Sequence, residues 1–455
     1  MNSSSDQPST NDKREIFGWA MYDWANSAFS TTIGTVFLGP YLASLAATAA
    51  EAYSDGMARF LGIPIAPDSF MPYAVSLSVG LQVLFLPILG AIADYSHLRK
   101  QMMQFFAIIG ALATICLFFV TEPVWWLGGI LFMIANLAFG AAIVFYNAYL
   151  PDIASEDQRD RVSSYGWAMG YLGGGLLLVF NLVFYQLHEK LGVPTGLTVR
   201  INMASAGFWW MGFSLITWAR LRSRKATRQL PEGETYIKVG VKQLWKTIRE
   251  IKNFPETLKY LVAYFLYNDG IQTVIAVSAT FAAAPILRGG LEIDQGTLTM
   301  VILMIQFVAF GGALFWGKLA NWVGAKRSII ISLVIWAGVV SFTYFGLYGE
   351  TRVLQFWILG ALIALVMGGS QAISRSLFAQ MIPDGKEAEY YSFYEISERG
   401  TSWIGPMIFG IMNQAFGSLR PAILSLIFFF VMGLIILPFV NVDKAIAAVK
   451  DHQTS

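Results

Sequence analysis

The sequence predicts an all-α integral membrane protein in which twelve transmembrane helices form two pseudo-symmetric bundles of six. Three observations predict this fold: a composition too poor in charge for a water-soluble surface, long apolar runs, and landmarks that recur in both halves of the chain. The 455 residues are 56% hydrophobic and 13% charged, whereas about a quarter of the residues of a soluble domain are charged. Almost the whole chain is therefore expected to lie in a bilayer.

The apolar runs have the length that a membrane-spanning helix requires, which is about 20 residues for a hydrocarbon core of roughly 30 Å. In the first half they cover Phe17–Leu45, Pro72–Asp94, Met102–Val120, Val124–Leu150, Val162–Leu187 and Ile201–Leu221. In the second half they cover Leu258–Leu287, Leu298–Trp322, Ser328–Leu347, Val353–Ile382, Tyr391–Phe416 and Pro421–Asn441. The predicted parts are a tail (1–16), a six-helix bundle (17–221), a linker (222–253), a second six-helix bundle (254–441) and a tail (442–455).

The distribution of basic residues predicts the orientation. Most of the 31 Lys and Arg residues fall in the two tails, the linker and the connections on the same side of the predicted bundles. Because basic loops are retained in the cytoplasm, both termini are predicted to be cytoplasmic. Within the linker, Val241 to Ile251 has the periodicity of a surface helix, and two interpretations stay open: a solvated connection or a segment that docks on the membrane surface.

The charge and the residue content of the sequence disfavour several classes of function. The formal net charge is +2 and no basic patch is evident, so nucleic acid is not an expected partner. Cys116 is the single cysteine and the three histidines are far apart, which gives no pattern for a metal site. No nucleophile motif is evident either, so we expect neither an enzyme nor a cofactor.

An internal repeat is the most informative feature. Asp23-Trp-Ala-Asn26-Ser27 in the first predicted helix and Asp269-Gly-Ile-Gln272-Thr273 in the seventh both read acid, two residues, carboxamide, hydroxyl. Residues three, four and seven apart share a helix face, so each helix carries one polar stripe. The candidate residues for a solute cavity and for proton coupling are Asp23, Asn26, Ser27, Ser30, Asn268, Asp269, Gln272 and Thr273.

Two further landmarks recur in the same order. Gly90 to Asp94, followed by Arg99 and Lys100, corresponds to Gly317 to Asn321, followed by Lys326 and Arg327; and Pro151 precedes Gly173 by the same spacing that separates Pro383 from Gly405. Such duplication into two sets of six helices is typical of major facilitator transporters, whose site lies between the halves near the bilayer midplane.

The two acids admit two interpretations. A carboxylate in a membrane span costs at least about 2.5 to 3.5 kcal/mol and usually faces a cavity or a partner. Asp23 and Asp269 are therefore candidates for proton or cation coupling, since protonation would link the charge to helix rearrangement. Alternatively, each acid accepts hydrogen bonds from neighbouring helices and only locks their packing.

A second group of charged residues is predicted at the cytoplasmic end. Arg375, Glu395, Glu398 and Arg399 lie in the predicted cytoplasmic halves of the tenth and eleventh helices. They form either an inner gate that breaks and re-forms, or a permanent pair that neutralises charges which burial would otherwise make costly.

Several segments resemble a known family. Trp19 to Ser27, Tyr165 to Gly173, Tyr267 to Thr273, Gln371 to Phe378 and Ser402 to Pro406 are similar to the autophagy-related vacuolar effluxer-like family of the major facilitator superfamily. The resemblance covers both halves and implies the twelve-helix fold, and it makes amino-acid efflux the first expectation because fungal vacuolar members are implicated in it. It also implies a prokaryotic-type member in the bacterial inner membrane.

The same resemblance gives the inner-loop motif a role. Gly90, Asp94, Arg99 and Lys100 are similar to the superfamily segment whose acid helps to hold the cytoplasmic gate. The second copy has Asn321 in the position of the acid, which argues against a symmetric gate.

The leading hypothesis is alternating-access secondary transport of a small polar solute, coupled to protons, by a monomer in the bilayer. The alternatives are a lipid or lysolipid transporter, and a non-transporting scaffold or sensor that uses the linker to recruit a partner.

Overall fold

The computed structural model describes residues 10–454 apart from 96–97, 148, 156–158, 224–232, most of 236–253, 380 and 382–402. Its contacts divide the chain into two compact units: Met1–Ile33, Leu84–Phe119 and Ile134–Gln243 form the first, and Gly34–Val83, Val120–Met133 and Leu244–Ser455 form the second. These units reflect contact density, so the predicted division into six-helix bundles joined by 222–253 stays a prediction. Most of the predicted surface helix 241–251 lies outside the described residues.

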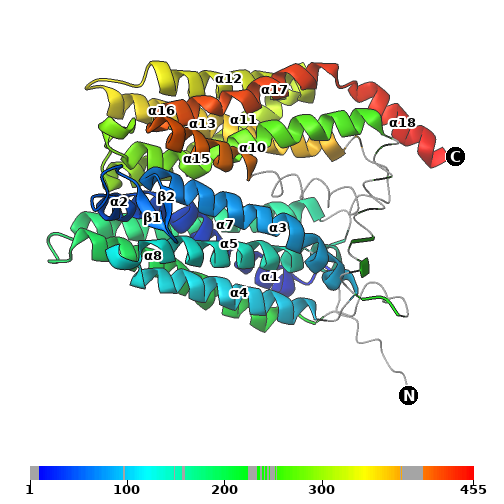
Figure 1. The fold of residues 1–455 in the computed structure, drawn as a ribbon. Helices are drawn as coiled ribbons and strands as arrows, with labels where there is room; N and C mark the ends of the chain where they lie inside the picture. Colours follow the sequence, from blue (N-terminus) through cyan, green and yellow to red (C-terminus); the bar gives the residue numbers. More distant parts are fainter. Residues whose placement is uncertain are drawn as a thin grey trace. The chain divides into compact units, whose positions relative to one another are not determined.

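The first unit is a bundle of long helices (Figure 1). It contains α1 (Lys13–Ala28), the end of α3 (Phe70–Tyr95), α4 (Arg99–Cys116), most of α5 (Trp125–Asn147), α6 (Leu150–Ile153), α7 (Arg159–Leu187) and α8 (Thr195–Arg220). The helix α1 packs against α7 and α8, and α4 packs against α8. Fully buried Trp210 of α8 lies in the core, where its ring contacts those of Phe29 and Phe139.

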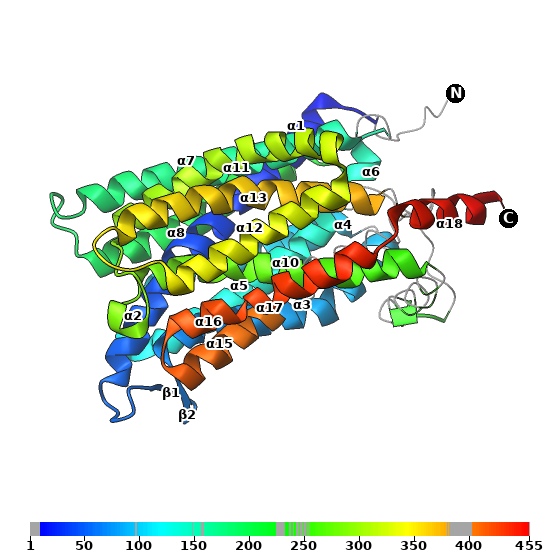
Figure 2. The ribbon, with the colours of Figure 1, turned by 90° about the horizontal axis from the view of Figure 1, so that it is seen from above.

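The second unit contains the remaining helices and a small hairpin (Figure 2). Its first segments are α2 (Leu38–Ala50), the antiparallel strands β1 (Ala58–Phe60) and β2 (Ile63–Ile65), and the short helix η2 (Pro67–Ser69). They are followed by the first parts of α3 and α5, and then by α10 (Pro255–Ala283), η6 (Ile286–Arg288), α11 (Gln295–Val323), α12 (Ala325–Phe345), α13 (Arg352–Ala379), α15 (Ile404–Phe416), α16 (Leu419–Ser425), α17 (Ile427–Ile436) and α18 (Val442–Thr454). The helix α10 packs against α15 and α17, and α11 packs against α13.

Local sequence signals explain where several helices begin. The side chain of Asp12 accepts a hydrogen bond from the backbone N–H of Arg14 and caps α1, and Asp294 caps α11 through Thr297 in the same way. Pro255 occupies the first turn of α10, where its missing N–H costs no helical hydrogen bond. Gly324, with φ +90°, forms the sharp turn between α11 and α12.

A described helix lies at each of the predicted spans. By length and hydropathy, seven spans of the described part are able to cross a membrane: Lys13–Ala50, Arg99–Phe119, Glu122–Asn147, Met169–Leu187, Ala325–Phe345, Arg352–Gln371 and Leu419–Phe439. The prediction of a multi-pass helical membrane protein is confirmed, and the count of twelve crossings stays a prediction.

The first predicted span differs from a regular helix. Between α1 and α2 the chain forms a π-helix, η1, over the nine residues Phe29–Phe37. Sequence periodicity assumed a continuous α-helix and gave no sign of this change. Because π-helical turns occur frequently at functional sites, η1 supports a functional role for the polar stripe that ends at its first turn.

Candidate functional site

Asp23 lies in a bonded cluster of the first unit. Its Oδ2 accepts a hydrogen bond from the hydroxyl of Tyr146 on α5, at 2.7 Å. The ring of Tyr146 stacks on that of Trp19 with centroids 4.3 Å apart, and the indole N–H of Trp19 donates to the Tyr146 carbonyl. Asp23 is half-buried, so one side chain joins the packing of α1 against α5 and also keeps some accessible surface.

The rest of the first stripe has a graded exposure. Asn26 is buried, Ser27 is half-buried and Ser30 is exposed. The Ser30 hydroxyl donates to the Ser27 carbonyl at 3.1 Å. The predicted stripe therefore runs from the interior of the unit toward an accessible surface at the start of η1.

Glycines of α7 allow this stripe to approach closely. A Cβ added at Gly166 would lie 2.7 Å from Asp23 Oδ2, and one at Gly170 would lie 2.7 Å from Ser27 Oγ. At Gly173 it would overlap the backbone of Trp24. Close helix packing is thus the role of these glycines. Gly175 of the same helix differs from them, because a Cβ added there would meet nothing within 4 Å.

Asp269 occupies the corresponding place in the second unit with different partners. Its Oδ2 accepts a hydrogen bond from the backbone N–H of Gly405, at 2.8 Å. Gly405 lies in the first turn of α15, whose cap residue Trp403 makes no side-chain cap hydrogen bond. Asp269 therefore caps α15 from another helix, where the positive end of the helix dipole favours a negative charge.

The Asp269 carboxylate is almost completely buried. Asp269 is 1% exposed, and its Oδ1 has no hydrogen-bond partner among the described residues. Both conditions make an ionised carboxylate costly at this position. The arrangement is suited to a group that gains or loses a proton when its surroundings change.

The other predicted residues of the second stripe lie next to Asp269 in the sequence of α10. The Thr273 hydroxyl donates to the Asp269 carbonyl at 2.7 Å and would be overlapped by a Cβ at Gly405. Asn268 is fully buried, whereas Gln272 is half-buried. Gly405 thus gives α10 and α15 their close approach, as Gly173 does for α1 and α7.

Sequence reasoning missed two polar partners, Tyr146 and Ser374. Tyr146 holds Asp23, and Ser374 of α13 links two tyrosines of α10: the Tyr260 hydroxyl donates to its carbonyl and the Tyr267 hydroxyl shares a hydrogen bond with its Oγ, both at 2.7 Å. A buried tyrosine hydroxyl signals that some partner exists, but not which helix supplies it.

Tyr146→Phe is expected to remove the hydroxyl donor of Asp23 while keeping the stacking on Trp19. A hydrogen bond to a charged group contributes about 1.5 to 3 kcal/mol, so the variant should melt at a lower temperature in detergent. Tyr165→Phe, at an exposed position of α7, is the control and should melt like the wild type. Equal melting of both variants would show that the Asp23–Tyr146 hydrogen bond contributes little.

The predicted gate residues are described in part. Arg99 forms an ion pair with Asp152 of α6, with 2.7 Å between Nη1 and Oδ2, and Lys100 donates to the Leu221 carbonyl at 2.7 Å. Both contacts lie within the first unit. Gly90 is placed only as part of the α3 backbone, the side chains of Asp94 and Arg375 lie outside the described part, and so do residues Glu395, Glu398 and Arg399.

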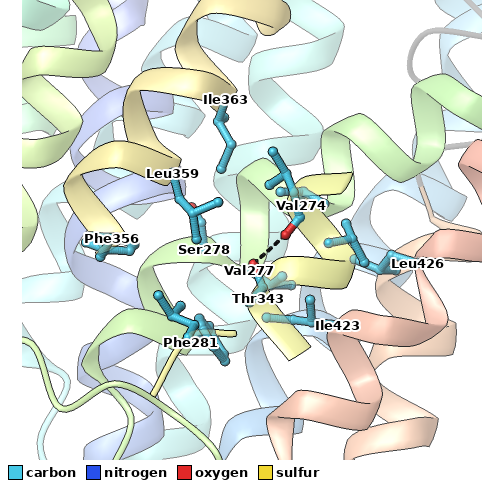
Figure 3. Close-up of a pocket in the computed structure, with 13 residues that line it drawn as sticks. Val274, Val277, Ser278, Phe281, Thr343, Phe356, Leu359, Ile363, Ile423 and Leu426 are labelled. Atoms are coloured by element: carbon cyan, nitrogen blue, oxygen red, sulfur yellow. Dashed lines mark hydrogen bonds between the residues drawn. The ribbon is translucent and has the colours of Figure 1, made fainter. Parts of the chain in front are cut away.

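One cavity of the second unit has none of the predicted site residues in its lining. It is lined by apolar side chains of α10, α12, α13 and α16, and among its few hydroxyls Thr343 donates to the Val339 carbonyl at 2.8 Å (Figure 3). Its volume is about 40 Å³, which holds a water molecule or two and no solute. The cavity is a packing feature of this unit.

Comparison with known proteins agrees with this architecture. The family model described as "Vacuole effluxer Atg22 like" matches residues 11–450. The uncharacterized MFS-type transporter YxiO of Bacillus subtilis is 29% identical over 93% of this chain and 94% of its own. Autophagy-related protein 22-1 of Penicillium rubens is 26% identical over 95% of this chain and 90% of its own.

Solved transporters share the fold at low sequence identity. A mutant form of the nucleoside transporter NupG aligns with a TM-score of 0.65 over 94% of this chain and 98% of its own, at 13% identity. The xylose transporter XylE of E. coli aligns with a TM-score of 0.58 over 94% of both chains, at 13% identity. The predicted major facilitator fold is confirmed, and so is the assignment to a family of transporters, which are not enzymes.

Proposed function

Because this chain belongs to the vacuole effluxer Atg22-like family, we propose that it is a proton-coupled secondary transporter that moves a small polar solute by alternating access. Efflux is the favoured direction, in keeping with the family description, and amino acids are the first candidates because the sequence resemblance implies them. We place the protein in a bacterial inner membrane as a monomer with both termini in the cytoplasm, since its basic residues favour that orientation.

The observation that carries the proton coupling is the Asp269 cap on α15. The carboxylate accepts the Gly405 N–H with one oxygen, and the other oxygen is buried without a described partner. Proton binding would remove the negative charge from the N-terminal end of α15, where charge and dipole contribute up to about 2 kcal/mol in partly buried sites. Protonation would therefore weaken the attachment of α15 to α10.

The free energy of this charged cap is large enough to drive a change between two conformations of a transporter. A difference of about 1.4 kcal/mol changes the ratio of two conformations tenfold, so the loss of one charged cap is enough to change which state predominates. Asp23 is the second candidate. Its accessible surface and its bond to Tyr146 suit contact with the solute or with a second proton.

The test is solute flux in proteoliposomes with an imposed pH gradient. Metabolite profiles of a deletion strain and an overexpressing strain, inside and outside the cells, would choose the labelled solute, with amino acids tried first. We expect accumulation that follows the pH gradient and disappears with a protonophore. Flux that ignores the gradient would refute the coupling. No flux of any profiled solute would favour a scaffold or sensor, and flux of a lysolipid would favour a lipid transporter.

A further inference from the structure

A polar seam joins the first and second halves of the sequence inside the second unit. We name it the η2 seam; its residues are Asp68, Ser69, Tyr73, Arg288, Gly410, Asn413 and Gln414. Ser69 Oγ donates to the Gly410 carbonyl at 3.0 Å and accepts from Asn413 Nδ2 at 2.8 Å. The Tyr73 hydroxyl donates to Gln414 Oε1 at 3.1 Å. The segment before α3 is thus fastened to α15.

An ion pair closes the same seam beside η6. Asp68 Oδ2 lies 2.9 Å from Arg288 Nη1, with the side chain of Asp68 3% exposed and that of Arg288 28% exposed. In the described part of the chain, Asp68 Oδ1 is buried and has no hydrogen-bond partner. The acid is therefore deeply buried, whereas the cation that faces it keeps contact with solvent.

The elements packed against η2 add no other charge among their described residues. The helix α2 has a single ionisable side chain, Tyr41, whose hydroxyl donates to the Val120 carbonyl, and α15 has none. The first two turns of α3 contain Tyr73, which is bonded to Gln414. Arg288 is thus the charged group that faces Asp68 in the seam.

We propose that Asp68 is the proton-binding residue of a gate, the η2 seam, which closes the solute pathway at this end of the protein. The proposal rests on the alternating-access function proposed above, because only a transporter that opens each end in turn has to break such a seam. Asp68 and Arg288 come from the two sequence halves that alternating access moves apart. Neither residue lies in a predicted span, so protons reach Asp68 from the aqueous side when the seam opens.

The direction of the pH effect follows from the burial of Asp68. Burial raises the pKa of Asp68 to about 6, although the Arg288 guanidinium lowers it. An exposed carboxyl has an ordinary pKa of about 3.9, so the closed seam binds a proton more tightly than the open one. By linkage, acidification favours the closed seam, and the closed-to-open ratio should rise about tenfold from pH 7.5 to pH 5.

The experiment measures this ratio directly. Spin labels at the exposed positions Ile63 and Leu287, in a Cys116→Ser background, would report the distance across the seam in nanodiscs without solute. The expected result is an approximately tenfold larger closed-to-open ratio at pH 5 than at pH 7.5. No pH effect, or an effect of opposite sign, would overturn the proposal.

Variants separate Asp68 from other titrating groups. Asp68→Asn should make the ratio independent of pH over this range. Ser69→Ala, the control, should lower the ratio at every pH and keep the pH effect, because it removes a hydrogen bond and no charge. An unchanged pH effect in Asp68→Asn would overturn the proposal. If Asp68→Asn does not fold, Arg288→Gln replaces it: the midpoint of the pH effect should move to higher pH, and an unmoved midpoint would overturn the proposal.

Different results would refute the proposed gate and the proposed transport function. The label distances need no solute, so a pH-dependent seam without flux would support the gate and refute proton-coupled transport. Proton-driven flux with a pH-independent seam would support proton-coupled transport and refute the gate.

Discussion

Asp269→Asn is expected to abolish accumulation driven by a pH gradient and to leave solute exchange intact. The amide oxygen of asparagine still accepts the Gly405 N–H, but the residue has no charge to gain or lose. With one proton per solute, a gradient of two pH units supports about 100-fold accumulation, since each pH unit is worth about 1.4 kcal/mol. The variant should show no accumulation above the external concentration.

The measurement is labelled solute inside proteoliposomes, first with the gradient and then as counterflow at equal pH. Asp294→Asn is the matched control, because it also neutralises an acid that caps a helix, in this case α11 at an exposed position. It should accumulate solute like the wild type. If Asp269→Asn still accumulates solute, Asp269 serves only packing, and Asp23→Asn becomes the variant on which proton coupling depends.

The repeat in the sequence predicted the parts of the site that depend on local spacing. The stripe with Asp23 and the stripe with Asp269 fall on corresponding helices, and the glycine landmark of each half packs against the helix that carries the acid: Gly173 on α1 and Gly405 on α10. Helical periodicity makes such positions readable, because residues three and four apart must share a face.

The contacts that distinguish Asp23 from Asp269 could not be predicted from the sequence. Asp23 and Tyr146 are separated by 123 residues, and Asp269 and Gly405 by 136. No spacing rule relates such distant positions, and many tyrosines and backbone N–H groups of the chain are equally suitable donors. The pairing is set by how whole helices pack. For this reason the sequence showed two similar acids, whereas the structure gives one a hydroxyl partner and the other a helix terminus.

The η1 segment and the η2 seam lay beyond sequence reasoning for related reasons. A π-helix has hydrogen bonds from residue i to i+5, and a segment of nine residues is too short for its different periodicity to be recognised in the sequence. Asp68 and Arg288 are in connections between predicted spans, and such positions are normally interpreted as exposed loop charges. Their significance comes from the burial of Asp68, which only the packing of η2 reveals.

Gly173→Ala is expected to destabilise the protein, whereas Gly175→Ala, two residues away on the same helix, is expected to stabilise it slightly. Both changes replace a glycine inside α7, and alanine is favoured there by about 1 kcal/mol in helix propensity. The difference lies in the surroundings: a methyl group at Gly173 overlaps the Trp24 backbone, and one at Gly175 meets nothing within 4 Å. Helix backbone cannot move aside as a flexible side chain does.

Overpacking of this kind costs about 1 to 3 kcal/mol beyond the gain in propensity. Thermal melting of both variants in the same detergent should therefore place Gly173→Ala below the wild type and Gly175→Ala at or above it. Because Trp24 follows Asp23 directly, displacement of α1 by the new methyl group should also disturb the Asp23–Tyr146 hydrogen bond and lower transport. Equal melting temperatures would mean that α1 and α7 are less closely packed in the bilayer than their glycines indicate, and the positioning of Asp23 would then need another explanation.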